Sequence, residues 1–150
     1  MPDIISDMTS LEETRAVWET ILGAAPLFDI YGYWPTLHDA VVRELRVGFA
    51  EHELTLVVDY SDLVLGRESE SNTRTRITMR WFGITESTLR MHNGDLYGIG
   101  FARVKGLLET RFDDYCYGLD GAIFSEGVEV MCTEHVPKLP NDAFIELTLR

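Results

Sequence analysis

Residues 73–81 read TRTRITMRW, and the stretch alternates between two kinds of side chain. Successive side chains of a β-strand point to opposite faces of its sheet. One face would therefore carry Thr75, Ile77, Met79 and Trp81, and the other would carry Arg74, Arg76, Thr78 and Arg80. This pattern is typical of an antiparallel strand with one buried face, and it predicts a cationic outer face. We expect the arginines to pair with acids such as Glu53 and Asp59 on a neighbouring strand.

Further strands are predicted on both sides of this stretch. Residues 41–49 and 53–60 alternate around a short turn at residues 50–52, which indicates a β-hairpin with one buried face. Later strands are expected at residues 88–92, 115–124, 128–133 and 143–149. Residues 101–111 fit either a strand followed by a helical turn or a short second helix. The alternation predicts about six to eight strands.

A helix is expected near the N-terminus. Ser10 and Glu13 have the spacing of a capping box, so the helix should begin at Ser10 and end near Gly23. Its apolar residues fall close to helical spacing, which indicates an amphipathic helix that packs on the sheet. Residues 23–37 combine turn formers with aromatic residues and predict an ordered connection. The expected fold class is α+β, mainly antiparallel β-sheet with this N-terminal helix packed on it.

Length and composition are those of a single domain spanning residues 1–150. Hydrophobic residues make up 45% of the chain and charged residues 25%, so a packed core is expected. The longest uncharged apolar runs are too short to cross a membrane. The first ten residues have neither the basic start nor the apolar stretch of a secretory signal. We therefore expect a cytoplasmic protein with no membrane partner.

The chain is strongly acidic, with a formal net charge of −12. Nucleic acids need clustered lysine and arginine side chains against their phosphates, so direct binding to nucleic acid is not expected. The charge is uneven, because the arginines of residues 73–111 form a basic strip between two acidic segments.

The sequence carries none of the common catalytic signatures, such as a G-x-x-x-x-G-K loop, a G-x-S-x-G elbow or an H-E-x-x-H pair. Cys116 and Cys132 lie in apolar-rich segments, and we expect them to be reduced core residues. Neither cysteine has the close spacing of a zinc ligand. We predict no catalytic residue, no cofactor and no metal site.

His38 and Asp39 form the one pair of side chains that could take part in a reaction, because a carboxylate can orient an imidazole. Two interpretations stay open. In the first, His38 packs or hydrogen-bonds beneath the aromatic loop, and Asp39 caps or terminates that loop. In the second, both side chains line a pocket with Tyr31, Tyr33 or Trp34, and the protein is a small-ligand binding or enzymatic domain.

The same region carries a longer motif. Residues 31–40 read YGYWPTLHDA and lead directly into the strand expected at residue 41. This segment resembles a signature of the Immunity protein 50 family, in which a W-P-x-F-H-D motif precedes a first strand. Leu37 stands at the position of the family's phenylalanine. The later order, WFGI at residues 81–84 and YGLDG at residues 117–121 before a strand, is similar to the family's layout.

The resemblance implies a bacterial intracellular antidote that binds and blocks one domain of a polymorphic toxin, and it brings no catalytic residues. In this interpretation Trp34, Pro35, His38 and Asp39 organise the fold. An acidic protein is steered towards a basic partner. A nuclease toxin, which must be basic around its active site to hold phosphates, fits this hypothesis.

Candidate contacts with the toxin domain are acidic side chains of surface elements, at the hairpin of residues 41–60 and in the segments that follow. They are Glu51, Glu53, Asp62, Glu68, Glu70, Asp113 and Asp114. Besides the small-ligand pocket, a third class remains open, a structural homo-oligomer joined through exposed sheet edges.

Overall fold

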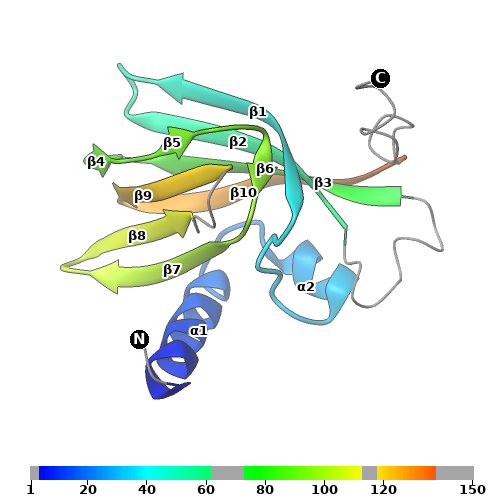
Figure 1. Ribbon diagram of the computed structural model, residues 1–150, viewed down its shortest axis with the longest axis horizontal. Helices are drawn as coiled ribbons and strands as arrows, with labels where there is room; N and C mark the ends of the chain where they lie inside the picture. The colour runs from blue at the N-terminus through cyan, green and yellow to red at the C-terminus, as the bar shows by residue number, and fades with distance from the viewer. Residues whose placement is uncertain (1–3, 62–72, 113–117, 138–150) are drawn as a thin grey trace.

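A computed structural model describes residues 4–61, 73–112 and 118–137, which form two short helices and ten strands (Figure 1). The helices are α1 (Ile4–Trp18) and α2 (Ala25–Tyr31). The strands are β1 (Ala40–Gly48), β2 (Glu53–Tyr60), β3 (Thr73–Phe82), β4 (Glu86–Ser87), β5 (Arg90–Met91), β6 (Asp95–Leu96), β7 (Ile99–Val104), β8 (Leu107–Phe112), β9 (Leu119–Ser125) and β10 (Gly127–Pro137). The fold class is α+β with mainly antiparallel sheet, as the sequence predicts.

The first sheet has the strand order β10-β3-β2-β1-β6, and each of its pairings is antiparallel. β3 lies between β2 and β10. Its residues Ile77, Met79 and Trp81 are completely buried, which confirms the face assigned to them from the alternation. The hairpin predicted at residues 41–60 is formed by β1 and β2.

The second sheet has the strand order β4-β9-β8-β7, and β5 also pairs with β9. It joins the first sheet where the antiparallel pairing of β3 with β10 continues, through a bend, into the pairing of β4 with β9. We call this continuous pairing the bent ladder. Gly127 of β10 pairs with Phe82 of β3, and Phe124 of β9 pairs with Glu86 of β4. Between these pairs the Glu126 amide donates to the Phe82 carbonyl at 3.1 Å. The two sheets therefore share a corner and fold towards each other.

The hydrophobic core fills the space between the two sheets. The indole Nε1 of Trp81, on the first sheet, donates to Thr110 Oγ1, on the second, at 2.8 Å. The ring centroids of Trp81 and Phe112 lie 5.7 Å apart. Both sheets thus contribute to one buried cluster.

Helix α1 packs against β7 and covers the edge of the second sheet. The Thr14 hydroxyl accepts from the Phe101 amide at 3.1 Å and donates to the Phe101 carbonyl at 3.3 Å. Trp18 meets the Phe101 ring edge to face, with centroids 5.3 Å apart. Figure 1 shows both helices on the lower side of the molecule, away from the β1–β2 turn. One threonine side chain therefore replaces a neighbouring strand at this position.

Thr14→Val is expected to lower the free energy of unfolding by about 1–3 kcal/mol, because it leaves the buried amide and carbonyl of Phe101 without partners. Urea denaturation at neutral pH measures the change. Thr20→Val is the matched control, since Thr20 is exposed and its hydroxyl donates to the Val17 carbonyl of its own turn. Its expected cost is about 0.5 kcal/mol or less. Equal losses in the two variants would contradict this role of Thr14.

The helical region differs from the sequence-based expectation. Helix α1 already begins at Ile4, so Ser10 lies inside the helix and the predicted start at Ser10 is wrong. A Ser-x-x-Glu pattern marks a helix start only where the preceding residues are not helical. The helix ends at Trp18, and a second helix, α2, occupies part of the predicted connection. Pro26 in its first turn and Gly32 in the left-handed region after its last residue favour these ends.

The strands also differ from the prediction of six to eight. The described residues form ten strands, because several pairings of only two residues leave no readable alternation. The strand expected at residues 88–92 is reduced to Arg90–Met91. Residues 101–111 belong to the β7–β8 hairpin, whose turn has positive φ at Lys105 (51°) and Gly106 (83°).

Two further expectations concern the cysteines and the last strand. Cys132 is a free thiol but is exposed, so its prediction as a core residue is wrong. It pairs with Thr78, on the outer side of the first sheet. Cys116 and the strand expected at residues 143–149 lie outside the described residues.

Candidate functional site

The sheet edges differ in how they are covered. Thr14 of α1 covers β7 at Phe101, as described above. β10 is covered at Val130, whose amide donates to the Leu22 carbonyl at 2.8 Å. β1 pairs with β6 only at Ala40 and Val41. Within the described part of the chain, residues 44–48 of β1 therefore have a strand on one side only, and their outer edge is open.

A groove of about 440 Å³ lies along this open edge. We call it the edge groove. One wall is formed by Leu45, Val47 and the β1–β2 turn, and the other by residues 84–91. The Ile84 amide donates to the His52 carbonyl at 3.0 Å at one end. The Val42 amide donates to the Gly94 carbonyl at 2.7 Å at the other. These two hydrogen bonds limit the open stretch of the β1 edge to the residues between them.

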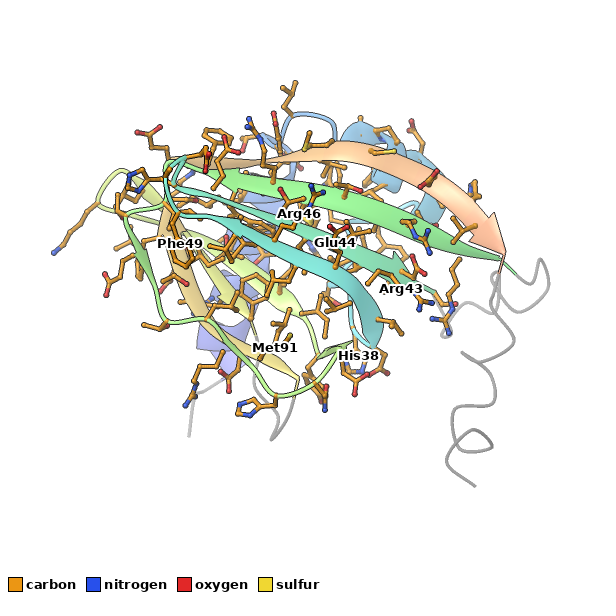
Figure 2. All side chains as sticks on the ribbon, turned by 90° about the horizontal axis from the view of Figure 1, so that it is seen from above. His38, Arg43, Glu44, Arg46, Phe49 and Met91 are labelled. Carbon is orange, nitrogen blue, oxygen red and sulfur yellow. The ribbon has the colours of Figure 1, made fainter. Side chains whose placement is uncertain are left out.

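The rim of the edge groove is apolar and exposed. Phe49 is 84% exposed, Met91 is 62% exposed and Val47 is 49% exposed. Figure 2 shows Phe49 at the hairpin end of β1 and Met91 on the neighbouring segment. Exposed aromatic and methionine side chains gathered at one place are typical of surfaces that bind other proteins.

A buried carboxylate fixes the wall that carries Met91. Asp120 of β9 is 1% exposed. Arg90 donates to both of its oxygens, at 2.9 and 3.2 Å, and His92 Nε2 lies 3.1 Å from Oδ2. The neighbouring Gly121 has φ +109°, and a Cβ there would lie 2.4 Å from the Thr88 carbonyl oxygen. The segment is thus held closely against β9, and the groove is formed before anything binds.

The outer face of the first sheet is an ion-pair ladder, as the sequence predicts for its arginines. Asp59 is 1% exposed. It accepts from Arg76 Nε at 2.8 Å and from Arg43 Nε at 2.7 Å. Arg80 contacts Glu53 at 2.7 Å and Glu129 at 2.8 Å. The predicted pairing is therefore confirmed for Arg76 with Asp59 and for Arg80 with Glu53. Arg74 Nε is buried and has no hydrogen-bond partner among the described residues.

The pKa of Asp59 reflects opposing causes. Burial alone would raise the pKa of this carboxyl group, because the charged form loses solvation. Hydrogen bonds from Arg76 and Arg43, together with their positive charges, outweigh burial and hold the pKa below its ordinary value of 3.8. Asp59 is thus a charged structural group and not a proton donor at neutral pH.

The motif at residues 34–39 is divided between interior and surface. Pro35 is buried, and Trp34 stacks on Trp18 with centroids 5.8 Å apart. The side chains of His38 and Asp39 are 51% and 64% exposed, and His38 Nε2 lies 3.4 Å from Asp39 Oδ2. Leu37 and Asp39 both have φ of +62°, so the segment is a tight turn rather than an extended strand. In such a turn adjacent side chains can meet.

The structure does not bring His38 together with the three aromatic residues considered for a pocket. His38 Nδ1 lies 2.7 Å from the Tyr97 carbonyl, and its ring meets the Tyr97 ring edge to face. Tyr31 instead donates to Thr75 Oγ1 at 2.6 Å in the interior. Tyr33 faces Tyr60, with the hydroxyls 3.4 Å apart, and Trp34 packs on α1.

The acidic residues predicted as contacts have different positions. Glu51 is exposed in the β1–β2 turn, next to the edge groove. Glu53 lines the groove, but its carboxylate is engaged by Arg80. The other predicted contacts, Asp62, Glu68, Glu70, Asp113 and Asp114, lie outside the described residues.

The sequence did not identify the apolar rim as a site. Leu45, Val47 and Phe49 alternate like the buried face of a strand. A phenylalanine at a hairpin tip, directly before the turn, was the available signal that this face continues into solvent. Met91 lies far away in the sequence, and only the fold places it opposite β1.

In residues 4–61, 73–112 and 118–137, there is no group of three or more His, Cys, Asp or Glu side chains that could hold a metal ion. Neither helix in these ranges has the length and apolar character that crossing a membrane requires.

A scan against protein-family models, a search of curated proteins and a search of solved structures each found no match to this chain. Membership of the Immunity protein 50 family therefore stays a prediction that rests on the motif at residues 31–40.

Proposed function

We propose that this chain is an immunity protein that binds a cognate bacterial toxin domain and neutralises it by occupying its surface. The observation that carries the proposal is the edge groove with its exposed rim of Val47, Phe49 and Met91. Large apolar side chains cost free energy when they face water, and a contiguous patch marks a surface that a partner covers. The motif resemblance supplies the class of partner.

Charge supports a basic toxin domain, and a nuclease is the favoured class. The chain carries a net charge of −12. Within the described residues, Glu51 and Glu86 beside the groove form no ion pair. An acidic surface accelerates encounter with a domain whose active site is positive, and salt slows that encounter. The proposed place of action is the cytoplasm, where such a toxin would attack nucleic acid.

Phe49→Ala is expected to weaken binding to the toxin domain by about 30-fold, the effect of losing an aromatic anchor worth about 2 kcal/mol. The measurement is calorimetric titration against the C-terminal toxin domain encoded next to this gene, together with survival of cells that express that domain. Phe49 is exposed, so the variant should keep its thermal stability. Leu22→Ala is the matched control, because Leu22 is 74% exposed and lies away from the groove.

Tight one-to-one binding that protects cells would support the proposal. If the neighbouring toxin domain does not bind, and cells expressing it are not protected, the proposed function is wrong. If it binds but Phe49→Ala and Leu22→Ala behave alike, the protein is an immunity protein that uses another surface.

A further inference from the structure

The open edge of β1 is a site for backbone recognition as well as for apolar contact. An edge strand offers unpaired amide and carbonyl groups that can accept another strand. In the described structure, residues 44–48 of β1 pair only with β2. Of the other edges, β7 is partly covered at Phe101 by Thr14, β10 is partly covered at Val130 by Leu22, and β4 is only two residues long. We therefore expect β1 to be the edge that receives an added strand.

We propose that the toxin domain inserts an extended segment into the edge groove, where it adds a strand to β1. The proposal rests on the proposed function and specifies how the partner is recognised. The opposite wall is itself bonded to β9, through the pairs Glu86–Phe124 and Arg90–Asp120. The added segment would therefore lie between the two sheets and join their free edges.

The length of the segment follows from the open stretch of the β1 edge. This stretch is limited by the Ile84–His52 and Val42–Gly94 hydrogen bonds, and β1 offers residues 44–48 between them. A strand rises about 3.4 Å per residue, so the paired part of the partner is about five residues, or roughly 17 Å. Its two ends must leave the groove on the open side.

The side-chain pattern of the segment follows from the two faces of β1. Leu45 and Val47 pair with Leu56 and Leu54, which are buried in the core, so these four side chains share the inner face. Alternate side chains of an added strand would point in the same direction. They would meet Leu45, Val47 and Met91, and should therefore be apolar.

Charge adds one further requirement. On the outer face Glu44 and Arg46 already contact each other at 2.7 Å, so they do not strongly favour a positive or a negative side chain in the partner. At the hairpin end, Glu51 and Glu86 are exposed and have no ion pair among the described residues. We therefore expect a lysine or arginine in the partner at that end. The occupant is a short strand of a basic protein, apolar at every second position.

The test combines an edge variant with amide hydrogen exchange. Val47→Lys places a charge on the inner face of the open edge and should weaken toxin binding at least about tenfold, as should Met91→Lys. Met131→Lys is the matched control, because Met131 is 57% exposed on β10, at the opposite edge of the first sheet. Thermal denaturation first checks that each variant is folded.

Exchange is compared with and without the toxin domain. Slower exchange at residues 44–48 in the complex, with weak binding of the two groove variants and unchanged binding of Met131→Lys, supports strand addition. Tight binding that leaves exchange at residues 44–48 and the affinity of Val47→Lys unchanged overturns strand addition, and the proposed function survives.

If the toxin domain does not bind, a peptide decides the inference separately. The probe is a synthetic ten-residue peptide of alternating valine and lysine, and the control has the same composition with the lysines grouped at one end. Protection of residues 44–48 by the alternating peptide alone supports strand addition without the toxin. Equal effects of the two peptides, or no protection, overturn it. So does a dimer in ultracentrifugation that Val47→Lys dissociates, because a second copy would then occupy the edge.

Discussion

Asp59→Asn is expected to lower the free energy of unfolding by about 3 kcal/mol, because it removes the charge that two partly buried arginines share. Arg43 and Arg76 would keep 24% and 31% of their side chains exposed, which limits the loss. Urea denaturation at neutral pH measures it. Glu53→Gln is the matched control, since the Glu53–Arg80 pair is about one-third exposed on both sides and should contribute about 1 kcal/mol or less.

The same carboxylate makes stability depend on pH in one direction. The pKa of Asp59 is lower in the folded state, so the unfolded state binds more protons in acid. Its stabilisation is complete above the ordinary value of 3.8 and is lost as the pH falls through the lower folded value. The stability difference between wild type and Asp59→Asn should be constant from neutral pH to about pH 5 and shrink in stronger acid. A difference that grows on acidification would contradict the assignment.

Trp81→Ala is expected to have the largest effect on folding, a loss of about 3–5 kcal/mol, because it empties a large volume between the two sheets. Trp81 is completely buried and bonds across the core to Thr110. The free energy of unfolding of a typical domain is only about 5–15 kcal/mol. The effect of Trp81→Ala is therefore measured as the shift of the urea midpoint and the yield of folded protein. An unfolding free energy within about 1 kcal/mol of wild type would contradict a core shared by both sheets.

Thr110→Val tests the hydrogen bond between Trp81 and Thr110 without removing the large side chain of Trp81. It keeps the volume of the side chain but leaves the buried N–H of Trp81 without its acceptor, at an expected cost of about 1–3 kcal/mol. Leu22→Ala, at an exposed position, should change stability by about 0.5 kcal/mol or less.

The alternation at residues 73–81 predicted both faces of β3 because each face meets a different environment. Ile77, Met79 and Trp81 are buried in the core, and Arg76 and Arg80 contact the acids of β2. A period of two residues carries this information locally. The same locality explains the failure at Ser10, where the capping pattern is present but the chain before it is already helical.

The edge groove could not be predicted in the same way. Alternation identifies the two faces of a strand but not which of its edges has a neighbour. Val47 and Phe49 are exposed because β6 pairs with β1 only as far as Val41. The positive φ at Leu37 and Asp39 could not be predicted from the sequence either, because neither residue is a glycine.

The bent ladder between the sheets has a consequence for the growing chain. β1, β2 and β3 leave the ribosome in order, but β4 and β5 bond to β9, and β3 bonds to β10. Pairings between such distant segments form late, after the intervening residues have been synthesised. A nascent chain that has not reached Leu119 therefore has the β1–β2 hairpin but lacks the support of the opposite wall. The groove is assembled only after β9 has been synthesised, and until then Val47 and Phe49 of the hairpin have no opposite wall.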